Sequence, residues 1–143
     1  MRSFCLAIAA LLLGLGVAAP PAPAQDLLVP MDAEQSNHLK AYGAVFWALE
    51  NSQSVDWLLN YRGGSFLVPA TARLKQEFRV RGVSFRAIGS GASARIVSEV
   101  EADGSNMSVV RLEKAPKIAV YAPDTTLPWD DAVLLALTYA EVP

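Results

Sequence analysis

The stretch Val55-Asp56-Trp57-Leu58-Leu59-Asn60-Tyr61-Arg62-Gly63-Gly64-Ser65-Phe66-Leu67-Val68 carries the clearest structural signal in the chain. Its first half, Val55–Tyr61, is rich in branched and aromatic residues and predicts a strand. Residues 62–65 predict a loop, because paired glycines adopt backbone conformations that other residues avoid. Residues 66–68 predict a second short strand. The stretch therefore predicts two strands joined by a glycine-rich loop.

Strands and helices alternate on both sides of this stretch. Upstream, residues 27–30 predict a strand, and Asp32 with Gln35 has the form of a helix N-cap with its reciprocal partner, opening a helix that runs to about Asn51. Downstream, the expected elements are a helix at 71–81 ended by Gly82, a strand at 83–88, a helix at 92–102 capped by Ser90, strands at 107–112 and 117–121, and a helix at 129–140. This alternation predicts an α/β fold with a mostly parallel sheet and helices on both faces.

Two segments carry particularly strong apolar patterns. In the first helix, Leu39, Tyr42, Phe46 and Leu49 share one face, and further apolar residues extend around it. We therefore expect this helix to be covered on more than one side. Residues 117–121 form a nearly unbroken apolar run, which is typical of a strand buried on both faces.

Residues 1–24 have the three regions of a secretory signal peptide. A positive start is followed by an apolar run over residues 4–19, and Ala22-Pro23-Ala24 fits a small-x-small cleavage site. A transmembrane anchor is the alternative, but the run is shorter than the roughly 20 residues that span a bilayer. We expect export to the periplasm or the extracellular space. The mature α/β domain is expected over residues 25–143, as the N-terminal part of a longer protein.

Composition and charge exclude several classes of partner. The formal net charge is −2, and it is −3 once the leader with Arg2 is removed, since 11 basic and 14 acidic residues remain. This balance argues against a nucleic-acid binder, which needs positive charge to neutralise phosphates. It also argues against a polybasic membrane-surface module, so no membrane contact is expected after signal cleavage. The only cysteine, Cys5, lies in the leader, so the mature chain can form no disulfide and no cysteine–metal site.

Four loops are expected at the carboxyl ends of strands, where open α/β sheets bind ligands. The most site-like loop is residues 60–65, in which Arg62 could make a two-pronged contact with a carboxylate or phosphate while glycine N–H groups approach the same anion. The alternative is a tight turn with a surface arginine. The candidate ligand-binding residues across the four loops are Asp32, Asn60, Arg62, Gly63, Gly64, Ser65, Ser90 and Asp124.

No catalytic residue, metal site or cofactor is predicted from these residues. His38 is the only histidine, and it has neither a second histidine nor a cysteine with which to bind a metal. We expect it to be a helix-surface histidine or one with its hydrogen bonds satisfied. Asp130 and Asp131 are adjacent on a predicted helix, where their side chains diverge by about 100°, so they predict a helix start and not an acid pair.

Five segments of the mature chain resemble the exported bacterial family labelled asparagine synthetase B. They are Leu27–Asp32, Asn37–Gly43, Val55–Phe66, Leu112–Tyr121 and Pro128–Val133. The resemblance implies a class I glutamine amidotransferase-like fold whose catalytic turn lies beyond this chain. The label implies an asparagine synthase or amidotransferase. This chain, however, contains neither the cysteine nucleophile nor the Ser-Gly-Gly-x-Asp-Ser ATP loop of such an enzyme.

Two classes of function therefore remain open. In the first, the chain is the N-terminal part of an amidotransferase-like hydrolase or binding protein. In the second, it is a non-catalytic periplasmic α/β module that binds a small ligand or a partner protein.

Overall fold

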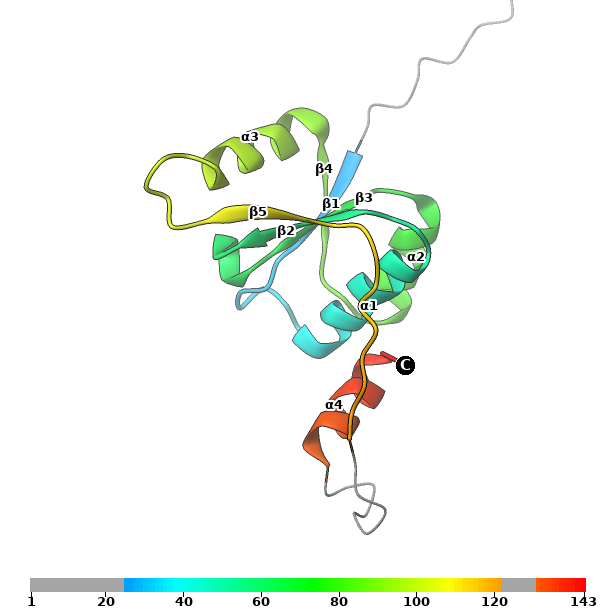
Figure 1. Cartoon of the computed structure of the whole chain (residues 1–143). Coiled ribbons are helices and arrows are strands. Elements are labelled where there is room, and N and C mark those ends of the chain that lie inside the picture. The colour runs from blue at the N-terminus through cyan, green and yellow to red at the C-terminus, as the bar shows by residue number, and fades with distance from the viewer. Residues whose placement is uncertain (1–24, 122–130) are drawn as a thin grey trace, which may run out of the picture.

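The computed structural model describes residues 25–121 and 131–143. Within them, one five-stranded sheet has the strand order β4-β1-β3-β2-β5 (Figure 1). The strands are β1 (Gln25–Val29), β2 (Val55–Leu59), β3 (Phe66–Pro69), β4 (Arg86–Gly89) and β5 (Ser108–Leu112). The helices are α1 (His38–Glu50), α2 (Ala72–Val80), α3 (Ser90–Val100) and α4 (Ala132–Ala140), with a 3-10 turn at Tyr61–Gly63.

The sheet is covered on both faces. Helices α1 and α2 lie on one face, and α3 lies on the other (Figure 1). The strands supply alternating side chains to two cores, since Leu27 and Val29 face α1 and α2 while Leu28 faces α3. Helix α4 packs against α1 on the side away from the sheet (Figure 1). This confirms that α1 is covered on more than one side.

The prediction of a mostly parallel sheet is wrong, because all four neighbouring strand pairs are antiparallel. The strand–helix–strand connections do join strands of the same direction, as in a parallel sheet. None of these pairs is adjacent in the sheet: β3 lies between β1 and β2, β1 lies between β3 and β4, and three strands lie between β4 and β5. The short loop from β2 to β3 could only give an antiparallel pair, since a parallel crossover needs a dozen or more residues.

The start of α1 also differs from the prediction. The helix begins at His38, and Asn37 is its N-cap, with Oδ1 accepting from the Lys40 amide at 3.0 Å. Asp32 accepts from the Glu34 amide instead and shapes the preceding turn. Gln35 is buried and bonds the backbone of Pro30 and Ser84 through three hydrogen bonds of 3.0 to 3.2 Å. Asp32 and Gln35 therefore do not form a capping box. Asp32 stabilises the turn, and the Gln35 side chain joins the backbones of Pro30 and Ser84.

The burial pattern of α1 departs from the predicted apolar face as well. The buried residues of α1 are mostly small and include Ala41, Ala44 and Ala48 beside Val45 and Leu49. Leu39 and Tyr42 remain 43% and 46% exposed. The predicted face therefore combines exposed side chains with side chains that line the pocket described below.

Residues 117–121 do not form the buried strand that their apolar run predicted. They are extended but have no strand partner among the described residues, and Tyr121 is 89% exposed. The chain leaves the sheet after β5, so these side chains lie beside the helices and not between sheet neighbours. The last predicted helix is present as α4, with Asp131 as its N-cap; residues 129 and 130 lie outside the described residues.

Candidate functional site

The first candidate site is a loop cluster at one end of the sheet. Strands β1 and β2 run in the same direction, so their carboxyl ends lie at the same end of the sheet. The loop after β1 carries Asp32 and Glu34, and the turn after β2 carries Arg62. The backbone amide of Met31 donates to the carbonyl of Arg62 at 3.2 Å and joins the two loops. We refer to Asp32, Glu34 and residues 60–65 as the loop cluster.

Arg62 is the electrostatic centre of the loop cluster. Its Nε lies 2.7 Å from Asp32 Oδ2, and a terminal nitrogen lies 2.9 Å from Glu34 Oε2. Glu34 also pairs with Arg86 from β4. The guanidinium of Arg62 is thus shared by two carboxylates of its own chain. An incoming anion would have to displace them, so the geometry favours a tight, internally paired turn over an anion site.

The ion pairs shift the acidity of all three groups. The hydrogen bond from Arg62 lowers the pKa of Asp32, with a further contribution from the Glu34 amide. The hydrogen bond from Arg62 also lowers the pKa of Glu34. In return, Asp32 and then Glu34 raise the pKa of Arg62. The cluster is therefore fully ionised at neutral pH, which suits charge pairing and gives no group poised to exchange a proton.

The turn after β2 has an unusual backbone. Asn60, Arg62, Gly63 and Gly64 all have positive φ, at 62°, 46°, 81° and 93°. Gly63 is required for a second reason, because a Cβ there would lie 2.3 Å from the Met31 carbonyl oxygen. The buried hydroxyl of Ser65 donates to the Arg62 carbonyl at 3.2 Å. Two glycines and a buried serine therefore act as parts of the turn.

The predicted site residues divide into three groups. Asp32, Arg62, Gly63, Gly64 and Ser65 come together in the loop cluster, and the Asn60 side chain reaches from it to the Asn106 carbonyl. Ser90 begins α3 at the opposite end of the sheet from the loop cluster, because β4 is antiparallel to β1. Asp124 lies outside the described residues. Ligand binding by these residues stays a prediction.

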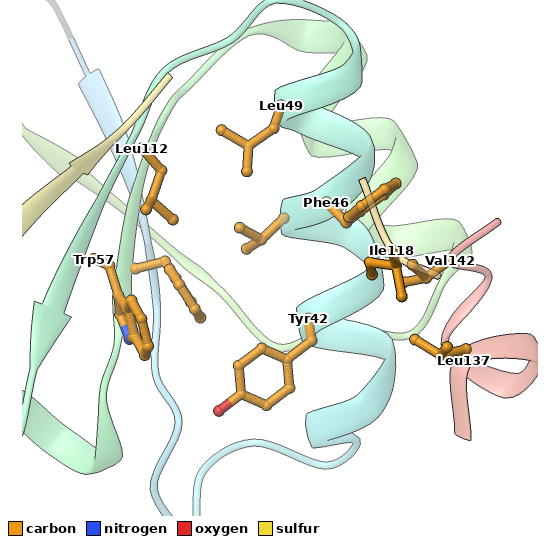
Figure 2. Close-up of a pocket in the computed structure, with 10 residues that line it drawn as sticks. Tyr42, Phe46, Leu49, Trp57, Leu112, Ile118, Leu137 and Val142 are labelled. Carbon is orange, nitrogen blue, oxygen red and sulfur yellow. The ribbon is translucent and has the colours of Figure 1, made fainter. Parts of the chain in front are cut away.

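A second candidate site is an apolar pocket of about 260 Å³ on the α1 side of the sheet. Its side chains come from α1, from strands β2, β3 and β5, from the segment after β5, and from α4 and one residue beyond it. They are Tyr42, Val45, Phe46, Leu49, Trp57, Phe66, Leu112, Ile118, Leu137 and Val142. Figure 2 shows Trp57 and Leu112 on the sheet side, with Ile118, Leu137 and Val142 on the other. We call this space the apolar pocket.

Aromatic contacts hold the inner wall of the apolar pocket. The ring of Trp57 stacks on Phe66 at 5.9 Å between centroids, and Tyr42 meets Phe66 edge-on at the same distance. Phe66 is 2% exposed, whereas Tyr42 stands half open at the rim. The Trp57 indole N–H donates to the Gly64 carbonyl at 3.1 Å. The tryptophan that walls the pocket is thus fixed by the turn of the loop cluster.

The sequence interpretation did not identify the apolar pocket. Tyr42, Phe46 and Leu49 share one helix face, and this spacing predicted only that the helix is covered on more than one side. The remaining walls come from segments far apart in the sequence, so no local spacing could reveal them. The one usable signal was a helix with more large apolar side chains than a single sheet face can cover.

Neither site holds recognisable catalytic or metal chemistry. Across residues 25–121 and 131–143, no three histidine, cysteine or acidic residues gather as metal ligands would. His38 Nε2 lies 3.2 Å from the Met31 carbonyl, which satisfies this ring nitrogen as expected. In the same ranges, no helix has the length and apolar character needed to cross a bilayer.

Comparison with known proteins finds no match to this chain among family models, curated proteins or solved structures. Membership of the family labelled asparagine synthetase B therefore stays a prediction. The antiparallel sheet contradicts the mostly parallel sheet that the alternation of strands and helices predicted. The geometry of the two candidate sites consequently carries the functional argument.

Proposed function

We propose that the chain is an exported, non-catalytic module that binds a small apolar molecule in the apolar pocket. The observation that carries this proposal is the pocket lining, in which all ten residues have apolar or aromatic side chains and none is charged. Ligand sites are typically concave and mostly apolar, with few polar groups. The loop cluster, whose charges are paired internally, supports the fold around this pocket.

The size and walls of the pocket define the class of ligand. A space of about 260 Å³ lies below the usual range for drug-sized ligands, so it fits a single ring system or a short hydrocarbon chain. Trp57, Phe66 and Tyr42 favour a ring, because edge-on and stacked aromatic contacts add about 0.5–1.5 kcal/mol beyond area burial. The exposed Tyr42 side chain offers one hydroxyl for a ligand oxygen, while the Trp57 N–H is already bonded to the Gly64 carbonyl.

Titration with the neutral fluorophore N-phenyl-1-naphthylamine tests this proposal. Saturable enhancement of its emission, with parallel quenching of tryptophan emission through Trp57, is expected. Leu112→Trp should fill part of the pocket and weaken binding at least tenfold. Val80→Trp, on the exposed face of α2 and away from the pocket, is the matched control and should bind like the unmodified chain.

Circular dichroism melts establish that both variants fold. Absence of saturable binding, or equal binding by the Leu112→Trp variant, would overturn the proposal. Export is tested separately by the intact mass of protein from an exporting host. A mature chain that begins at Gln25 is expected, and a retained leader in the membrane fraction would contradict export.

A further inference from the structure

We infer that β5 is a dimerisation edge, at which two copies of this chain join their sheets through antiparallel β5–β5 pairing. In the described part of the chain, β5 is the last strand of the sheet on its side, and all five of its residues pair with β2. Its outer edge therefore offers one row of backbone N–H and C=O groups to another strand. This inference is independent of the proposed ligand site.

The two edges of the sheet are built differently. At the other edge, β4 has four residues, ends in a glycine and leads directly into α3. Its Arg86 pairs with Glu34. Strand β5 contains no proline, lysine or glycine over Ser108–Leu112. Strand β5 is thus the longer of the two edge strands, and its one charged residue, Arg111, is paired within its own chain.

The sequence of β5 is complementary to itself across a two-fold axis. Centring the axis on Val110 places this residue opposite Val110 of the partner subunit, Arg111 opposite Val109 and Leu112 opposite Ser108. Val110 is a 37% exposed apolar side chain that such pairing would cover. A two-fold contact of one patch with itself is the commonest way in which identical chains associate.

The charges of β5 are compatible with this register. Arg111 is the only charged residue of the strand, and its guanidinium lies 2.8 Å from Asp56 of β2 in the same chain. In the paired strands, the two Arg111 side chains would be diagonal neighbours, about 7–8 Å apart at the backbone, and not directly opposite. Each would keep its own Asp56, so the contact brings no unpaired like charges together.

The expected dimer is weak and reversible. Specific stable interfaces bury about 1,600 Å² in total, and one five-residue strand from each copy supplies only part of that area. The backbone pairing fixes the register, while the valine contact excludes water at the axis. The weight-average mass should therefore rise with concentration from that of one chain toward that of two.

Analytical ultracentrifugation of the purified chain, with Val110→Lys and Val110→Glu variants, tests this inference. Each variant places two like charges face to face at the axis and should raise the dimer dissociation constant at least tenfold. An equimolar mixture should restore association as a heterodimer, visible by native mass spectrometry, which a folding defect would not do. Val80→Lys, the same exchange at a 72% exposed site on α2, should dimerise normally.

A monomer at every concentration would overturn the inference. So would a dimer that persists unchanged in both Val110 variants, since the contact would then lie elsewhere. Failure of the mixed variants to associate would refute the two-fold register.

Discussion

Replacing Gly43 by alanine should loosen α4, although alanine stabilises most helices relative to glycine. Gly43 lies in the middle of α1, where the last turn of α4 packs against it. A Cβ at this position would lie only 1.6 Å from the Ala140 carbonyl oxygen. Real Cβ atoms keep at least about 3.0 Å, so the two helices must separate by about 1.4 Å. A change of side-chain rotamer cannot relieve this clash, because the nearest atoms all belong to the Ala140 backbone.

Two opposing effects decide the sign of this prediction. The better helix propensity of alanine contributes up to about 1 kcal/mol. Overpacking a close contact costs typically about 1–3 kcal/mol. We therefore expect a net loss of about 1–2 kcal/mol in the free energy of unfolding. Because α4 is held by few other elements, the strain should appear mainly as its partial release from α1.

Urea unfolding and amide hydrogen exchange measure the two expected effects. The Gly43→Ala variant should unfold at lower urea, and residues 132–140 should lose protection before the sheet does. Gly91→Ala is the matched control, since Gly91 lies in α3 with no heavy atom within 4 Å of the added Cβ. That variant should be neutral or more stable. A Gly43→Ala variant that is equally stable, with unchanged protection of α4, would falsify the packing described here.

Two further predictions concern the loops. Gln35→Ala removes three hydrogen bonds to backbone partners and should lower the free energy of unfolding by about 2–4 kcal/mol. Gln76→Ala, on the exposed face of α2, is the control and should change it by less than about 0.5 kcal/mol. Similar losses in both variants would show that the Gln35 hydrogen bonds do not stabilise the fold. Arg62 lowers the pKa of Asp32 and Glu34, so their pairing stabilises the fold above the ordinary carboxyl pKa of about 4 and is lost as the pH falls through the lowered values. Arg62→Gln should flatten this acid dependence in urea unfolding measured from pH 5 downward, and an unchanged slope would show that the pairs do not contribute.

Local signals in the sequence predicted most elements but not their arrangement. The strands around residues 55–59 and 66–69, and the helix ended by Gly82, lie close to where branched residues and a glycine stop indicated. The alternation of strands and helices was real, yet the parallel sheet inferred from it was wrong. The alternation of strands and helices predicts only that two strands joined through a helix run in the same direction. Whether these strands are neighbours depends on the strand order, and here other strands lie between them.

The apolar run at 117–121 shows a similar limit. Its composition fits a buried strand, but burial depends on a free place in the sheet, and the described sheet ends at β5 on that side. Ile118 instead lines the apolar pocket. Likewise, Asp32 and Gln35 had the spacing of a helix cap, while contacts with Arg62 and Ser84, 30 and 49 residues away, determine what they do. The spacing of neighbouring residues in the sequence cannot predict contacts with partners so far along the chain.

The loop cluster and the apolar pocket are parts of one arrangement. Arg62 is held at a φ of 46°, a conformation that costs of order 1–3 kcal/mol, and it is bonded there to two carboxylates and to the Met31 amide. The turn held in this way presents the Gly64 carbonyl to the Trp57 indole, and that hydrogen bond sets the ring against Phe66 as a pocket wall. The residues that looked most like an anion site thus act on the apolar site next to them. The strained, charge-paired turn therefore positions one aromatic wall of the apolar pocket.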